Sequence, residues 1–289
     1  MESLQKSWTI RLLTSVTIIG ALFIGAASLP AAAGGLTIKK LAHNIKPSPD
    51  FTYVTETTPC IHISFSTSSD FIVTPSNPAC VSEMTKVIDG ARAVEGVKKL
   101  VLPSNWLRLS AVKQLFVITN IERIDRGFTP YIGMNASLNS VAQAAAKVKA
   151  DPYPPSSFAV GSSAPGIEGF ASVWAASPNV LSADYEWLYN DGWGGTRAAT
   201  SNYACLTATD SRCWGHRDAL LGWDPALRVG VGLRCTTCEM GAGVAPGPKG
   251  YEGIDTSMAV LVVRPSGQLP PMTFTWTQEL PYFHTPIHK

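Results

Sequence analysis

Apolar residues recur at helical spacing in two segments near the middle of the chain. Residues 110–126 carry apolar side chains on more than one stripe, which is typical of a mostly buried helix. Ser110 suits its N-cap, and Gly127 suits its end. Residues 135–148 show i, i+3, i+4 spacing up to Asp151-Pro152. We therefore expect a buried helix followed by an amphipathic core helix.

Shorter patterns follow toward the C-terminus. Residues 183–191 predict a third helix capped by Ser182, and residues 213–222 predict one or two helical turns. Three runs rich in apolar and β-branched residues predict strands: RVGVGLRC (228–235), SMAVLVVR (257–264) and MTFTWT (272–277). We expect the Gly- and Pro-rich stretch 239–253 to link the first two strands. Helices followed by strands predict an α+β domain with helices packed on an antiparallel sheet.

The N-terminal segment has the pattern of an export signal. Lys6 and Arg11 precede 22 uncharged residues, 12–33, whose apolar centre leads to an Ala triplet. This pattern predicts cleavage after Ala33, in a secreted or cell-envelope protein. The alternative is an uncleaved anchor, because such a stretch can just span about 30 Å of hydrocarbon. We expect contact with a membrane only if the segment stays attached.

The remaining chain divides into three parts by composition. Residues 34–107 are rich in Pro, Ser and Thr, and we expect an irregular N-terminal extension with short strands. Residues 108–264 are long enough to form one hydrophobic core and constitute the main domain. Residues 265–289 form a final strand and a polar tail.

Charge and motifs exclude several classes of function. Only 15% of the residues are charged and the formal net charge is +2, so we expect no nucleic-acid partner. The sequence lacks the G-x-S-x-G, P-loop, G-x-G-x-x-G and H-E-x-x-H motifs of common hydrolases, nucleotide-binding proteins and metalloproteases. We expect no cofactor.

Six cysteines agree with export to an oxidising compartment. They permit 15 pairings, and local spacing favours Cys60–Cys80, Cys205–Cys213 and Cys235–Cys238. A zinc site is the first alternative, because Cys213 and His216 precede Cys235 and Cys238 at a tolerable spacing. A redox C-x-x-C is the second, although that pair follows a strand-like run and enters a loop.

One histidine lies where a site can form. His216 stands at the start of the short helix expected at 213–222, and Asp191, Glu186 and Asp218 lie within reach along the chain. An enzyme would use His216 as a general base, oriented by one of these carboxylates. The spacing identifies no nucleophile. The other histidines lie in the extension or the tail, and we expect them to be solvated surface residues.

Four phrases in order resemble the CAP superfamily of cysteine-rich secretory, venom allergen and pathogenesis-related proteins, in its bacterial branch. The N-x-x-R-x-x-x-G phrase is Asn120, Arg123 and Gly127, and WLYNDG, NYAC and CWGHRDALLG follow. RVGVGLRC and GIDTSMAVLVV resemble the closing strands, so that the likeness covers 108–264. The resemblance implies a secreted three-layer α-β-α sandwich.

The resemblance also implies a cleft with two histidines and two glutamates that sometimes hold a divalent metal. His216 matches the second histidine, but no histidine occurs between 63 and 215 to match the first. One glutamate position falls at Asn190 and the other near Ala171 or Ser172. Because only one of the four residues is retained, we expect no metal site.

These observations favour an exported protein that acts by binding rather than as an enzyme. The resemblance offers lipids, cell-wall material and host proteins as ligands. We expect Trp187, Tyr189, Trp214 and Ser172 to line the ligand cleft. The alternatives are a secreted hydrolase or peptidase with His216 as its general base, and a structural module anchored in the envelope.

Overall fold

The computed structural model describes nine ranges of the chain: 38–39, 41, 44–45, 78–154, 166–195, 202–222, 230–247, 256–267 and 271–283. The chain divides into two units, Met1–Gly35 and Leu36–Lys289, and every described residue belongs to the second. The expected export signal and Cys60 therefore lie outside the described residues. No helix within the described ranges is long and apolar enough to cross a membrane.

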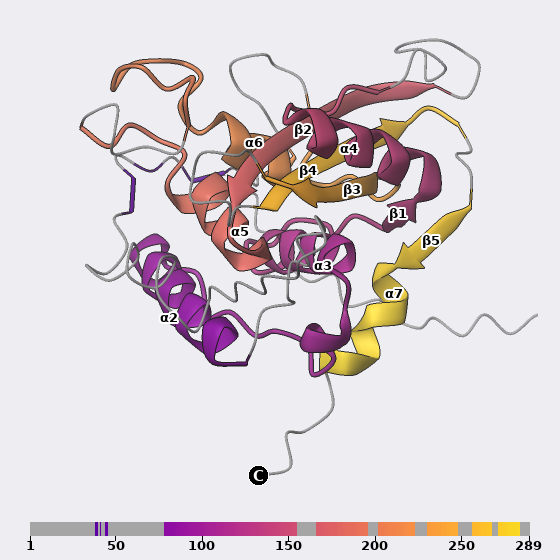
Figure 1. Ribbon diagram of the computed structural model, residues 1–289, viewed down its shortest axis with the longest axis horizontal. Coiled ribbons are helices and arrows are strands. Elements are labelled where there is room, and N and C mark those ends of the chain that lie inside the picture. The colour runs from indigo at the N-terminus through magenta and orange to yellow at the C-terminus, as the bar shows by residue number, and fades with distance from the viewer. Residues whose placement is uncertain are drawn as a thin grey trace, which may run out of the picture. The chain divides into compact units, whose positions relative to one another are not determined.

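The described ranges contain six α-helices and one five-stranded sheet, so the fold is α+β as expected (Figure 1). The strands are β1 (Gly133–Asn135), β2 (Ile167–Ser177), β3 (Glu239–Pro246), β4 (Thr256–Pro265) and β5 (Met272–Thr275). Their order in the sheet is β2-β4-β3-β1-β5. All neighbouring pairs are antiparallel except β1 and β3, which run parallel, and this corrects the prediction of a purely antiparallel sheet.

Helices cover both faces of the sheet. On β4, Met258, Val260 and Val262 belong to the large core cluster, which also contains residues of α3 (Ala111–Ile124) and α5 (Val180–Tyr189). The alternate residues Leu261 and Val263 pack with Leu138 of α4 (Ala136–Val148). Figure 1 shows α4 and α3 on opposite sides of β3. A strand buried on both faces explains the continuous apolar run of β4.

The two central helices form as predicted, for the expected local reasons. The Ser110 side chain accepts a hydrogen bond from the Lys113 backbone N–H and caps α3. The Asn135 side chain accepts from the backbone N–H groups of Ser137 and Leu138 and caps α4. Helix α3 is buried on nearly all sides, whereas α4 presents one apolar face to the sheet.

Strand β3 lies where the sequence led us to expect a linking loop. Its glycines made the segment resemble a loop, but they have a packing role. A Cβ atom at Gly241 would overlap with the Leu138 backbone, and one at Gly243 would overlap with the backbones of Ala142 and Gln143. Glycine therefore lets α4 approach β3 closely.

The run RVGVGLRC is not a strand in its described part. Residues 230–235 form bends and turns, with positive φ at Gly230 and Gly232. The backbone N–H of Gly232 donates to the Gly222 carbonyl at 2.6 Å, so that this segment closes against the end of the helix before it. The strand of this region is β3 instead.

The N-terminal extension contains a helix that the sequence analysis did not predict. Helix α2 (Pro78–Glu95) has 18 residues and buries Met84, Ile88 and Ala91 in the main core. The described C-terminal part of the extension is thus largely helical rather than made of short strands. The Pro-, Ser- and Thr-rich residues 46–77, on which that expectation mainly rests, lie outside the described residues.

Two smaller differences concern the start of α5 and the C-terminal segment. Helix α5 begins at Val180, capped by Asn179 rather than Ser182, because the Asn179 side chain accepts from the Ser182 backbone N–H. Strand β5 ends at Thr275, and Trp276 begins the short helix α7 (Trp276–Glu279) within the predicted strand MTFTWT. Thr275 and Gln278 form a reciprocal capping box that starts this helix.

Two of the favoured cysteine pairs are disulfides in the structure. The Cα atoms are 4.6 Å apart in Cys205–Cys213 and 5.5 Å apart in Cys235–Cys238. Cys80 is also disulfide-bonded, and its expected partner Cys60 lies outside the described residues. No described cysteine is free.

Candidate functional site

His216 lies in the first turn of α6 (Gly215–Leu221), and the residues before it fix where this helix begins. Trp214 adopts a left-handed backbone conformation with φ of 68° and turns the chain into the helix. The disulfide Cys205–Cys213 ends one residue earlier. The Asn202 side chain donates to the carbonyl of Asp191 at 3.2 Å and to that of Arg212 at 2.8 Å. The loop before His216 is therefore attached at both ends.

Arg123 holds the other end of α6. This fully buried arginine belongs to the N-x-x-R-x-x-x-G phrase, and it donates to the carbonyls of Thr129 and Leu221. The end of α6 needs a glycine, since a Cβ at Gly222 would lie 2.6 Å from the Arg123 guanidinium and φ there is 103°. The phrase thus has a structural role: it fixes the helix that carries His216.

The imidazole of His216 pairs with a buried carboxylate, as the sequence suggested. Nδ1 of His216 lies 2.7 Å from Oδ1 of Asp191, whose other oxygen accepts from the Arg217 backbone N–H at 3.0 Å. The Asp191 side chain is fully buried, whereas 27% of the His216 side chain is exposed. The aspartate is thus held from two sides, and it orients the ring.

The electrostatics of the pair favour a charged imidazole. Burial of the ring lowers the pKa of His216, but the nearby carboxylates of Asp191, Asp151 and Glu186 outweigh it and raise the pKa above its ordinary value. Burial raises the pKa of Asp191, although His216 and backbone N–H groups oppose that effect. His216 therefore holds its proton to a higher pH than a free histidine, whereas the raised pKa of Asp191 reflects the burial of its carboxyl group.

Two further carboxylates surround the imidazole. Glu186, predicted from the sequence, lies on α5, and its Oε1 accepts from the Ser177 hydroxyl at 3.0 Å. Asp151 follows α4, and its sequence pattern indicates only the end of a helix. Burial and the charge of Asp191 raise the pKa of Asp151, whereas His216 and the Trp174 backbone N–H lower it. Its position after a helix gives no sequence signal for this role.

Asp218, the third carboxylate considered from the sequence, is buried on α6. The hydrogen-bond partner of His216 within the described ranges is Asp191 instead. Two residues along a helix project from different faces, which explains why Asp218 does not orient His216.

A buried network of charges lies next to the site in the chain and joins three helices. Arg92, Arg126 and Arg217 pair with three carboxylates, those of Glu95, Glu122 and Asp125. The Nη1 atom of Arg217 also donates to the Leu188 carbonyl at 2.6 Å. The pairs join α2, α3 and α6, and each of these buried charges has at least one partner of opposite charge. Arg217 follows His216, so the network fixes the backbone N–H that holds Asp191.

The extension also contacts the segment around Asp191. The backbone N–H of Ile45 donates to the Tyr189 carbonyl at 2.9 Å. The side chain of Asn44 accepts from the Gly192 backbone N–H at 2.6 Å. These hydrogen bonds lie on either side of Asp191 in the sequence. The described part of the extension therefore helps to hold the candidate site.

The aromatic residues expected in a ligand cleft lie in different places. Trp187 is 3% exposed, and its indole donates to the Trp174 carbonyl at 3.1 Å. Tyr189 is fully buried, and its hydroxyl joins the charge network through Arg126 and Glu122. Both are core residues and do not line an open surface. Trp214 is half-buried, and its indole packs against Gly192, next to Asp191.

Ser172, the fourth cleft residue, lies within β2, half-buried and in register with Leu261 of β4. Within the described residues, no hydrogen bond joins its hydroxyl to His216. Of the predicted cleft residues, Trp214 is half-buried and lies against Gly192, next to Asp191.

The structure does not form the zinc site considered from the sequence. Cys213 is bonded to Cys205, and Cys235 is bonded to Cys238, so their sulfurs are not thiolate ligands. In the described ranges, no group of three or more His, Cys, Asp or Glu side chains has a geometry that holds a metal ion.

Comparisons with known protein families, with curated proteins and with solved structures find no match to this chain. The function must therefore be argued from the site itself.

Proposed function

We propose that this chain is an exported CAP-like protein that binds a hydroxyl-rich ligand, of the kind found in cell-wall polysaccharide, at the site around His216. The observation that carries the proposal is the His216–Asp191 pair, in which a partly exposed imidazole is held by a fully buried carboxylate. Asp191 engages Nδ1, so that Nε2 is a donor when the imidazole is protonated and an acceptor when it is neutral. In the described part of the chain, no protein group hydrogen-bonds to Nε2.

The groups around His216 match the chemistry of a sugar. Hydroxyl groups both donate and accept hydrogen bonds. The carboxylates of Asp151 and Glu186 offer acceptors, and the protonated imidazole offers a donor. The indole of Trp214 provides an apolar surface beside Asp191. A phosphate is a poorer fit, because the charges nearest to His216 in the described structure are the carboxylates of Asp191, Asp151 and Glu186.

The proposal of a CAP-like domain rests on sequence phrases and on the arrangement of the helices. The residues of the N-x-x-R-x-x-x-G phrase connect α3 to the end of α6, which carries the Gly-His pair. Helices on both faces of the sheet agree with the three-layer sandwich that the resemblance implies. Export rests on residues 1–33 and on the disulfides. A mature protein that begins at Gly34, measured by mass spectrometry, would establish removal of the segment and exclude the anchored module.

The binding proposal is tested by cosedimentation of the mature protein with insoluble peptidoglycan and, separately, with phospholipid vesicles. We expect retention on peptidoglycan and at least a tenfold weaker affinity for His216→Gln. Glu168→Gln is the matched control, because this exposed carboxylate on β2 pairs with Arg264 at 3.2 Å, away from His216. Equal binding by His216→Gln and wild type would contradict the proposal, as would retention on vesicles alone.

A hydrolase is the second candidate, and a specific observation favours it. An aspartate on Nδ1 with Nε2 directed outward is the arrangement of a histidine general base. Within the described residues, no hydroxyl or thiol lies at hydrogen-bond distance from this ring, so the attacking group would be water. Release of soluble sugars or peptides from peptidoglycan by the wild type, lost in His216→Gln, would favour this candidate over binding alone.

A further inference from the structure

A second site lies where the C-terminal segment packs against the start of α3. A pocket of about 490 Å³ is lined by residues of the 3-10 helix η1 (Trp106–Arg108), of α3, of β5 and of α7. This volume lies within the usual range for small-molecule sites. None of its lining residues belongs to the His216 site.

The walls of the pocket are held by specific contacts between distant segments. The backbone N–H of Trp276 donates to the Ile132 carbonyl at 3.1 Å, and that of Ser104 donates to the Tyr282 carbonyl at 3.1 Å. The side chain of Asn105 donates to Glu279 at 3.2 Å, across 174 residues of sequence. The pocket is therefore part of the folded domain.

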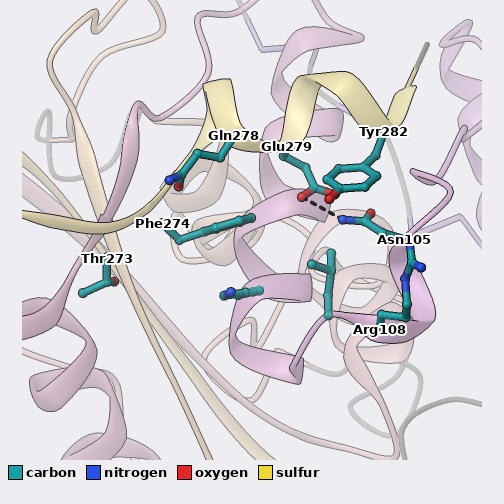
Figure 2. Close-up of a pocket in the computed structure, with 9 residues that line it drawn as sticks. Asn105, Arg108, Thr273, Phe274, Gln278, Glu279 and Tyr282 are labelled. Atoms are coloured by element: carbon teal, nitrogen blue, oxygen red, sulfur yellow. Dashed lines mark hydrogen bonds between the residues drawn. The ribbon is translucent and has the colours of Figure 1, made fainter. Parts of the chain in front are cut away.

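Two buried acceptors in this wall have no donor. Glu279 is fully buried and Asn105 is 6% exposed. Their hydrogen bond uses Oε2 of the glutamate, and it leaves Oε1 of Glu279 and Oδ1 of Asn105 without a hydrogen-bond partner in the described structure. Figure 2 shows this pair beside the Tyr282 ring, with Phe274 on the other side of the pocket. Unpaired buried acceptors are costly, so a group with several donors is the complementary ligand.

Positive charge and apolar surface complete the lining. Arg108 is exposed, and among the described residues no carboxylate pairs with its guanidinium. The ammonium of Lys113 lies 4.7 Å from the centre of the Phe274 ring, and it too has no ion-pair partner within the described ranges. The lining thus combines two buried hydrogen-bond acceptors that have no donor, two cationic side chains that form no ion pair with a described carboxylate, and aromatic rings.

We propose that this pocket binds a free α-amino acid with an apolar side chain. The α-ammonium group has three donors and no acceptor, which matches Glu279 and Asn105. The α-carboxylate pairs with Arg108 and Lys113, and the side chain packs against Phe274. A neutral sugar would leave both cations unpaired, and a fatty acid would leave both acceptors unpaired.

The state of Glu279 agrees with this assignment. Burial raises the pKa of Glu279, because the hydrogen bond from Asn105 and the charge of Lys113 compensate it only in part. A bound ammonium supplies the missing positive charge.

The test is NMR titration of the isotope-labelled mature protein with L-phenylalanine, N-acetyl-L-phenylalanine and L-phenylalanine amide. We expect L-phenylalanine to shift the resonances of the pocket residues. Acetylation removes the ammonium charge and amidation removes the carboxylate, and each should weaken binding at least tenfold. Absence of shifts at the pocket with L-phenylalanine, or equal binding of the acetylated compound, would overturn the proposal.

Variants separate the two ends of the ligand. Glu279→Gln keeps the shape of the side chain and should weaken L-phenylalanine binding at least tenfold. Arg108→Gln changes an exposed side chain that forms no ion pair with a described carboxylate, so it tests the carboxylate end even if Glu279→Gln fails to fold. Glu168→Gln and His216→Gln should bind like wild type. Weakening by His216→Gln, with no effect of Arg108→Gln, would overturn the assignment to this pocket, and it leaves the peptidoglycan assay as a separate test of the His216 site.

Discussion

Replacing Asp191 with asparagine should lower the pKa of His216, because the variant loses the carboxylate that lies 2.7 Å from Nδ1. Asparagine keeps an oxygen that can accept from the Arg217 backbone N–H, so the perturbation is mainly one of charge. Two unit charges at this distance interact by at most about 6 kcal/mol at an effective dielectric constant of about 20. A hydrogen bond to a charged group is typically worth about 1.5 to 3 kcal/mol net. One pKa unit corresponds to about 1.36 kcal/mol, so loss of a hydrogen bond of this strength should lower the pKa of His216 by about 1 to 2.

The assay is NMR titration of the histidine ring protons, with His216→Gln used to assign the His216 signal among the five histidines. Asp210→Asn is the matched control, because Asp210 lies on the nearby loop and pairs with Arg212 at 2.8 Å instead. We expect no change in the pKa of His216 in this control. A fall of less than about 0.3 in the pKa of His216 in Asp191→Asn would refute the reasoning, since the corresponding free energy is well below that of a hydrogen bond to a charged group.

The same pair makes a prediction about stability against pH. A histidine with a raised pKa in the folded state stabilises the protein fully below its unfolded pKa of about 6.5, and this contribution is lost as the pH rises through the folded pKa. Urea unfolding should therefore show a larger deficit for Asp191→Asn at pH 6 than at pH 9. An equal deficit at both values would show that the charge of His216 does not contribute.

Three further substitutions test a buried charge, a close helix–strand contact and a buried hydrogen-bond donor. Burial and the charge of Glu122 raise the pKa of Asp184 well above its ordinary value. The free energy of unfolding of the wild type should therefore fall as the pH rises from the unfolded pKa of about 4 to the folded pKa, by up to about 1.4 kcal/mol for each pH unit. Asp184→Asn removes this pH dependence. Urea unfolding at pH 5 and pH 8 should therefore show that the variant gains stability relative to the wild type at pH 8, and a gain at pH 5 alone would contradict the account. Gly243→Ala should cost about 1 to 3 kcal/mol in the same assay, because the added methyl group meets the Gln143 backbone, and a neutral effect would show that α4 can move away from β3. Arg123→Gln should cost about 3 kcal/mol, since it leaves buried carbonyl groups without donors, and a loss below about 1 kcal/mol would argue against its role in holding α6.

The sequence predicts most reliably where local signals decide the structure. Ser110 and Asn135 begin helices through their own side chains, and the apolar spacing after them is unambiguous. The segment 239–246 shows the opposite case. Its glycines are typical of a loop. In the structure they lie in strand β3, because a side chain at these positions would overlap with the backbone of α4. That approach is a tertiary contact, which no local pattern encodes.

The candidate site divides in the same way. The sequence predicts that one of three carboxylates orients His216, and the structure shows that this carboxylate is Asp191. The phrase around the histidine also predicts the short helix that carries it. Asp151 was missed, since nothing in its neighbourhood distinguishes it from any helix end. Trp187 and Tyr189 were expected in a cleft because aromatic residues serve both cores and binding surfaces, and only the packing of α5 assigns them to the core.

The central claim is that the site around His216 binds a hydroxyl-rich ligand, and NMR mapping with soluble glycan strands released from peptidoglycan tests it most directly. The account predicts shifts concentrated at His216, Trp214, Asp151 and Glu186 in the wild type, and their loss in His216→Gln while Glu168→Gln retains them. Shifts elsewhere on the protein, or none at saturating glycan, would contradict the claim.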